Sequence, residues 1–337
     1  RRQRQMCIRD RIYDLELSSD GMKILLVTRV RNVDADHDKA YVLDLTTAYD
    51  ISTCSRSSAT TDIDSDTFTS GSNAGEHDGT TEHMLQGIEV NEDGSKVFLL
   101  FNNRNCNSGE AGARLYEYTL STPYDLTTMS LVLNAGIRFD CFETGGVKNG
   151  AAMRFSPNGK RLFITNHDTQ QRGVTQISLT TAYDTSSFKM DGRVVLGGAF
   201  DNMSDGNDQP RGIAFNLNGL KMYITSDRST SGKDEIYEYD LNLKKENRLT
   251  YGARSFSPAY IKTDSSIAFL ATYDGAQDVY MYDLKRDRID KITDLENRPM
   301  LSSLKFNEFD NCLYFDISTS HYRDIAKISL QDSTFSM

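Results

Sequence analysis

Three stretches of this chain repeat one another closely: Leu45-Thr-Thr-Ala-Tyr-Asp-Ile-Ser-Thr53, Leu120-Ser-Thr-Pro-Tyr-Asp-Leu-Thr-Thr128 and Leu179-Thr-Thr-Ala-Tyr-Asp-Thr-Ser-Ser187. We call them the tyrosine tags. Repetition at a spacing of some tens of residues indicates an array of similar supersecondary units. Because a tyrosine holds the same place in each tag, we expect it to pack, against the neighbouring unit, while the following aspartate holds the turn.

Short turns recur ahead of the tags and continue after the last one. They are Ser19-Asp-Gly21, Glu92-Asp-Gly94, Pro157-Asn-Gly159, Leu217-Asn-Gly219, Thr263-Asp-Ser265 and Phe309-Asp-Asn311. Asp-Gly and Asn-Gly supply the positive φ angles that a tight hairpin needs. A short run precedes each turn and a more apolar run follows it, so each turn predicts a β-hairpin.

The segments that follow each turn also have the residue patterns expected of β-strands. Ile236–Leu241 and Val279–Leu284 alternate with the period of two that a strand requires. Val97–Phe101 and Ala268–Ala271 are apolar throughout, as expected for strands buried on both faces. With a weaker fourth run, such as Val194–Leu196, each unit is a four-stranded antiparallel blade. The sequence therefore predicts an all-β fold, a single closed β-propeller.

Six units can be counted, and a seventh blade within the longest insertion is the alternative. The predicted blades span residues 9–60, 84–140, 147–198, 209–252, 257–294 and 299–337. Residues 61–83 are rich in Ser, Thr, Asp and Gly, which is typical of a surface loop. Because an open ring would expose strand edges, we expect Gln5–Ile8 to supply the outer strand of the last blade.

Composition limits the class of partner. The 337 residues carry a net charge of −10, which repels phosphate backbones and excludes nucleic acid as an expected partner. No apolar run reaches the roughly 18 residues of a membrane span. The chain does not begin with Met, so we expect a processed product or part of a longer chain.

Two resemblances rest on these repeats. Gly87–Thr128 resembles the propeller repeats abundant in marine bacteriophage and marine bacterial surface proteins, and Gly150–Ser187 repeats the pattern. Asp234–Thr250 and Asp278–Thr293 resemble the TolB-type repeat through their Ile/Val-Tyr-x-Tyr-Asp-Leu endings. The resemblances imply a propeller scaffold. They imply no catalytic residues, because the shared motif is a packing motif.

Two loops carry alternate aspartates, which can direct their oxygens at one hard cation. The candidate Ca²⁺ ligands are Asp34, Asp36 and Asp38 in the first loop and Asp62, Asp64 and Asp66 in the second. The second loop has Thr67 and Asn73 where an EF-hand has Gly and Glu, so it is not an EF-hand. Ca²⁺ is the one cofactor that the sequence suggests, and solvated acidic turns are the alternative interpretation.

Polar groups also precede several predicted inner strands. In a propeller such loops gather at one mouth of the central channel. The candidate binding residues there are His77, Asp78, Asn149, Asp205 and Asp208. The alternative is ordinary loop solvation.

No sequence motif of catalysis is present: the chain lacks a His-Glu-x-x-His, a Gly-x-Ser-x-Gly and a phosphate-binding glycine loop. We therefore expect a non-enzymatic binding or structural module of an extracellular or virion-associated assembly, contacting partner proteins or glycans through long blade loops. One alternative is a propeller hydrolase or lyase acting on a glycan or lactone, with a metal or carboxylate site in the channel. Another is a TolB-like periplasmic interaction protein.

Overall fold

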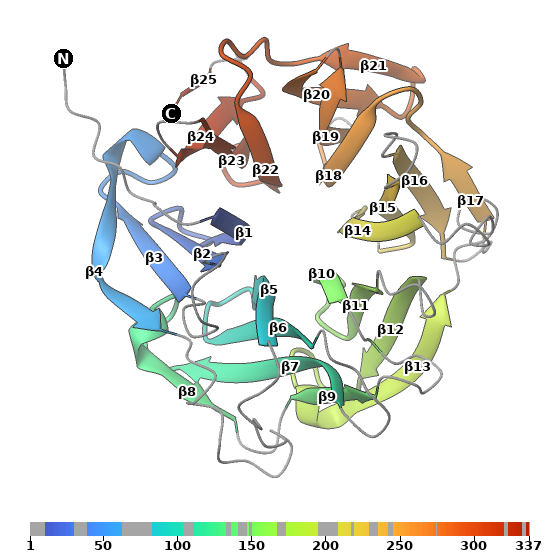
Figure 1. The fold of residues 1–337 in the computed structure, drawn as a ribbon. Coiled ribbons are helices and arrows are strands. Elements are labelled where there is room, and N and C mark those ends of the chain that lie inside the picture. Colours follow the sequence, from blue (N-terminus) through green and yellow to red (C-terminus); the bar gives the residue numbers. More distant parts are fainter. Residues whose placement is uncertain are drawn as a thin grey trace.

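The structure is a computed structural model. It describes residues 11–29, 39–62, 83–103, 111–132, 136–140, 147, 150–166, 173–194, 208–216, 219–228, 235–241, 245–263, 265–273, 275–319, 323–331 and 335–336. Six antiparallel sheets stand as blades around a central axis (Figure 1). The predicted all-β propeller is confirmed, and helix in the described residues is limited to short 3₁₀ turns. None of those turns has the length and apolarity needed to cross a membrane.

Each blade runs from an inner to an outer strand, and each strand pairs with the next. The first three blades are β1 (Arg11–Leu17), β2 (Lys23–Arg29), β3 (Lys39–Leu45) and β4 (Cys54–Asp62); β5 (His83–Val90), β6 (Lys96–Asn103), β7 (Ala111–Leu120) and β8 (Met129–Leu131), with β9 (Ile137–Asp140) also on β7; and β10 (Gly150–Phe155), β11 (Arg161–Asn166), β12 (Gly173–Leu179) and β13 (Phe188–Val194). The last three are β14 (Asp208–Phe215), β15 (Lys221–Arg228), β16 (Glu235–Asp240) and β17 (Lys245–Arg248); β18 (Arg254–Ile261), β19 (Ser266–Tyr273), β20 (Ala276–Asp283) and β21 (Arg288–Lys291); and β22 (Met300–Asn307), β23 (Cys312–Ser318), β24 (Arg323–Ser329) and β25 (Phe335–Ser336).

The hydrophobic core lies between blades. Each of six buried clusters draws its side chains from two neighbouring blades, and together the clusters join every blade to the next. The second strand of a blade contributes side chains to the clusters on both of its faces. In β6, Val97, Phe98, Leu99 and Leu100 are therefore all fully buried. One cluster unites the first and sixth blades, which closes the ring by packing.

The outer position of the last sheet belongs to β25, where Phe335 and Ser336 pair with Ile328 and Lys327 of β24. Gln5–Ile8 lies outside the described residues, so its strand stays a prediction. Most of the insertion, residues 63–82, also lies outside them. The described residues form six sheets and no seventh.

The tyrosine tags fold back onto the hairpin turns of their own blades. Tyr49, Tyr124 and Tyr183 have φ of 59°, 58° and 54°, which is the left-handed region. Each tyrosine N–H donates to the carbonyl of the turn glycine of the same blade, at 2.8 to 3.0 Å. The aspartate that follows each tyrosine accepts a hydrogen bond from the backbone N–H two residues later, as expected of a capping aspartate.

Each tag also touches the preceding blade. The Tyr124 hydroxyl oxygen lies 3.2 Å from Ser19 Oγ of the first blade, within hydrogen-bond distance. Lys96 Nζ of the second blade donates to the Tyr183 carbonyl at 2.7 Å, and Tyr314 Oη of the sixth donates to the Tyr49 carbonyl at 3.0 Å. The expected packing against a neighbouring blade is confirmed, and the contact with the tag's own hairpin is an addition to it.

A buried carboxylate strengthens one of these junctions. Glu117 of β7 accepts from Lys96 Nζ at 2.6 Å and, in the third tag, from both the N–H and the hydroxyl of Thr185 at 2.7 Å. The Thr185 hydroxyl oxygen in turn accepts from the Gly136 N–H at 2.7 Å. The other two tags have Ile51 and Leu126 at the Thr185 position, so the threonine serves this junction specifically.

Thr185→Val should lower the free energy of unfolding by about 2 kcal/mol, because the Gly136 N–H becomes a buried donor without an acceptor and Glu117 loses a hydrogen bond. Chemical denaturation measures the loss. Ser186→Ala in the same tag is the control, with an expected change below about 0.5 kcal/mol, since the Ser186 hydroxyl bond is exposed. Equal losses in the two variants would contradict the role given to Thr185.

Candidate functional site at the channel axis

Every inner strand carries a β-bulge, and the bulges of the fifth and sixth blades lie one residue nearer the hairpin turn than those of the other four. The pairing register shifts at Tyr13 in β1, Gln86 in β5, Ala151 in β10, Arg211 in β14, Ser257 in β18 and Ser303 in β22. All six residues line one axial cavity of about 220 Å³. A bulge bends its strand and redirects a side chain, so the six bulges shape the wall of the channel.

Just beyond the bulges, one position of each inner strand forms a ring. The six residues of this axial ring all pair with the equivalent position of the second strand. In blade order they are Glu16, Glu89, Arg154, Ala214, Ala259 and Lys305. Four blades thus contribute charges, and two adjacent blades contribute only a methyl group. The ring is crowded on one side of the axis and open on the other.

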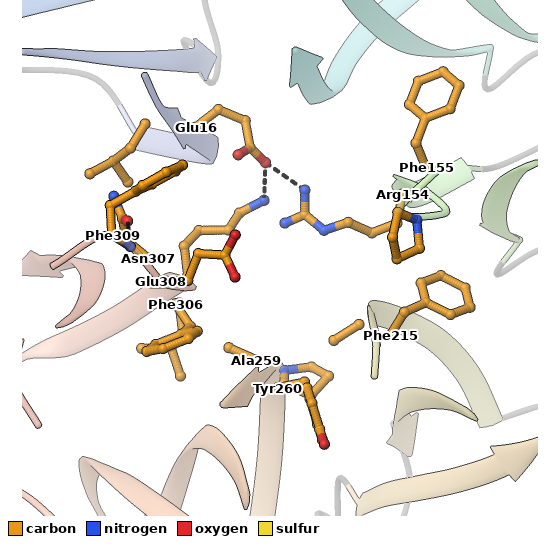
Figure 2. A pocket seen from close by; sticks show the side chains of 16 residues that line it. Glu16, Arg154, Phe155, Phe215, Ala259, Tyr260, Phe306, Asn307, Glu308 and Phe309 are labelled. Carbon is orange, nitrogen blue, oxygen red and sulfur yellow. Dashed lines mark hydrogen bonds and ion pairs between the residues drawn. The ribbon is translucent and has the colours of Figure 1, made fainter. Parts of the chain in front are cut away.

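The charges of the axial ring pair with one another. Arg154 Nη1 contacts a Glu16 carboxylate oxygen at 2.5 Å and also pairs with Glu89. Lys305 Nζ contacts Glu16 at 2.8 Å and Asp14 at 3.0 Å. Figure 2 shows Glu16 receiving both cations. The network links the first, second, third and sixth blades, and with it the two ends of the ring of blades.

Burial perturbs the acids of this network. It raises the pKa of Asp14 from 3.8 to about 7, against the lowering effect of Arg154 and with a further increase from Glu16. Backbone N–H donation by Ile88 and Leu15 limits the rise. Burial also raises the pKa of Glu16, although Arg154 opposes it. For Arg154 burial acts to lower the pKa, but Glu16 and Asp14 outweigh it and raise the pKa.

These shifts predict a pH dependence of stability. A carboxyl whose pKa rises on folding binds its proton more tightly in the folded state, so its contribution to stability falls as pH rises from about 4 to about 7. Asp14→Asn should therefore lose less free energy of unfolding over that range than the natural chain, as measured by denaturation at each pH.

Asp294→Asn is the control for this experiment. Lys291 lowers the pKa of Asp294 below 3.8, so that group changes stability only at more acidic pH. The variant should follow the natural chain between pH 4 and 7. A steep loss retained in Asp14→Asn would contradict the assignment.

Beside the axial ring lies a wider cavity of about 380 Å³, which we call the axial cup. It opens where the inner strands end and turn into the second strands. Aromatic side chains of four blades line it, with Glu308 among its polar groups, and Ala214 and Ala259 leave it room. In Figure 2 the Arg154 guanidinium and the Glu308 carboxylate face the same central opening.

The structure describes one of the five binding residues predicted from sequence, Asp208. His77, Asp78, Asn149 and Asp205 lie outside the described residues. Asp208 begins β14, at the opposite end of that strand from Phe215 in the cup. The predicted mouth is thus the other one, and its role stays a prediction.

The predicted Ca²⁺ ligands are likewise untested. Asp34, Asp36, Asp38, Asp64 and Asp66 lie outside the described residues. Asp62 ends β4, the outer strand of the first blade, far from the axis (Figure 1). Within the described part of the chain, no group of three or more His, Cys, Asp or Glu is placed to hold a metal ion.

Sequence reasoning missed the axial network, although a signal for it exists. Charged residues occur within the short runs that precede the hairpin turns, as in Asp14-Leu-Glu16-Leu and Met153-Arg154-Phe155. In a strand whose other face packs against the next blade, a charge at alternate positions points to the axis. Their pairing between blades needs the ring geometry.

Comparison with solved structures gives the same architecture. The chain is 14% identical to TolB from Acinetobacter baumannii (84% of this chain, 54% of that one, TM-score 0.50) and 12% identical to a prolyl endopeptidase (99% and 50%, TM-score 0.52). It is 9% identical to the β-propeller domain of Cps50 (Swd1) from Myceliophteria thermophila (99% and 88%, TM-score 0.54). No family model and no curated protein matches the chain. The chain spans about half the length of the first two structures, and the likeness shows the propeller fold alone.

Proposed function

We propose that this protein is a non-enzymatic binding module of an extracellular or virion-associated assembly, which engages partner proteins or glycans. The observation that carries the proposal is the axial cup. A concave site whose wall combines apolar side chains with converging polar groups is typical of a ligand site. The adjacent charges are engaged in ion pairs between blades, which supports a structural role for them.

The proposed location rests on the repeats. Their resemblance to marine phage and bacterial surface propellers supports an extracellular or virion-surface protein, whose partners are other subunits of the assembly or a cell-surface glycan. The long segments 52–83 and 102–113 are the proposed contacts to those subunits. The TolB-like later repeats and the likeness of fold to TolB support a periplasmic interaction protein as the alternative.

The test separates binding from turnover. The purified chain is incubated with arrays of glycans and peptides, and the retained ligands are recovered and weighed by mass spectrometry. A ligand retained with its mass unchanged is the expected result. A ligand that is cleaved or altered would show an enzyme instead and overturn the proposal.

One observation favours the enzyme as a second candidate. Asp14 and Glu16 lie in the channel and both form ion pairs with Lys305. The pKa of Asp14, about 7, suits a general acid or base near neutral pH. If the arrays reveal turnover of a glycan or lactone, Asp14→Asn should abolish it while Asp294→Asn leaves it unchanged.

A further inference from the structure

We infer that the axial cup binds a neutral ligand rich in hydroxyl groups, a saccharide, with Arg154 and Glu308 as its polar contacts. The inference rests on the proposed binding function and names the class of ligand. It follows from three properties of the cup: its balanced charge, its mixture of donors and acceptors, and its apolar wall.

The charges that border the cup are already compensated. Glu16 is shared by Arg154 and Lys305, and Glu308 pairs with Lys262 at 3.0 Å. An anionic or cationic ligand would compete with one of these pairs and leave a like charge beside it. A neutral ligand disturbs no pair, so the balance favours an uncharged molecule.

Hydrogen-bonding capacity nevertheless remains at the opening. Among the described residues, Arg154 pairs with both Glu16 and Glu89 through one nitrogen, Nη1. Glu308 accepts from Lys262 through Oε2. The N–H groups on Nε and Nη2 of Arg154 can donate, and Oε1 of Glu308 can accept. A hydroxyl group both donates and accepts, so neighbouring hydroxyls on one ring can bridge the guanidinium and the carboxylate.

The rest of the wall suits the carbon face of such a ring. Ala259 and Pro258 present a small apolar surface beside the opening, and Tyr260 and Phe306 continue it. Phe309 is 63% exposed at the rim of the cup. A saccharide ring carries C–H groups on its faces, which pack on apolar and aromatic surfaces. The volume of about 380 Å³ lies within the range of small-ligand pockets, about 300–1,000 Å³.

The experiment compares neutral and charged probes of one size. Methyl glucoside, methyl galactoside, methyl mannoside and N-acetylglucosamine are titrated by saturation-transfer NMR beside glucuronate and glucosamine. At least one neutral probe should bind more tightly than both charged ones. Glu308→Ala should weaken that binding about tenfold, the effect of losing roughly 1.4 kcal/mol. The matched control is Glu296→Ala, an exposed acid outside the cup, which should bind normally.

Ala259→Phe fills the cup from its open side and should abolish binding. Its melting temperature shows whether the variant folds. If it does not fold, the binding measured for Glu308→Ala tests the inference instead. The inference is overturned if no neutral probe binds, if a charged probe binds best, or if Glu308→Ala binds normally. If the arrays retain an unchanged peptide and no saccharide binds, this inference is wrong, whereas the proposed binding function remains supported. A saccharide that is consumed would instead remove the proposed function.

Discussion

Replacing Gly94 by alanine is expected to lower the free energy of unfolding by about 3 kcal/mol or more. Gly94 closes the hairpin of the second blade with φ +73°, a conformation that costs an L-residue about 1–2 kcal/mol. An added Cβ would also overlap the ring of Tyr124, closer than the 3.0 Å that real Cβ atoms respect. Overpacking of this kind costs about 1–3 kcal/mol more.

The clash cannot be relieved by a small movement of Tyr124. Its N–H is bonded to the Gly94 carbonyl at 3.0 Å, and its hydroxyl donates to the Glu92 carbonyl at 2.8 Å. The hydroxyl also contacts Ser19 of the first blade, so any shift of the ring disturbs the junction between two blades. We therefore expect the full steric cost to appear in the stability of the whole ring.

Gly252→Ala is the matched control. Gly252 has φ +79°, and an added Cβ there meets nothing within 4 Å. Its expected cost is the backbone strain alone, about 1–2 kcal/mol. Urea denaturation of both variants measures the difference. If Gly94→Ala and Gly252→Ala lose the same free energy of unfolding, Tyr124 does not constrain Gly94, and the interpretation of the tag as a packing element is wrong.

The fold could be predicted because its rules are local. Asp-Gly turns mark the hairpins, and the uniformly apolar second strands require burial on both faces. The repeated tags predicted a packing role for Tyr49, Tyr124 and Tyr183, and the structure confirms it. The left-handed backbone of these tyrosines was not foreseen, since that region normally selects Gly or Asn.

The candidate site could not be predicted in the same way. Polar loops drew attention to one mouth of the channel, whereas the axial ring combines residues as far apart in sequence as Glu16 and Lys305. Each is an ordinary charge in an ordinary strand. Their convergence depends on how many blades close the ring and on where the bulges fall, which no local pattern encodes.

Arg154→Met provides the most direct test of that convergence, with an expected loss of about 3 kcal/mol in the free energy of unfolding. The substitution keeps an unbranched apolar stem but removes the cation shared by Glu16 and Glu89, whose side chains are 23% and 10% exposed. Glu89 then has no cation of the axial ring beside it, and Lys305 alone remains for Glu16 and Asp14. Breaking a largely buried pair is costly because the remaining charge is desolvated without compensation.

Two comparisons isolate the charge effect. Lys262→Met removes the exposed pair with Glu308, whose side chains are 47% and 52% exposed, and should cost less than about 1 kcal/mol. Adding Glu89→Gln to Arg154→Met removes one unpaired carboxylate and should restore part of the loss. Because Arg154 lowers the pKa of Asp14 and of Glu16, its removal lets these acids protonate at higher pH. The destabilisation should therefore shrink as pH falls from 7 toward 4. A loss that is independent of pH and unrelieved by Glu89→Gln would show that Arg154 acts through packing alone, and that the axial ring is not an electrostatic clamp.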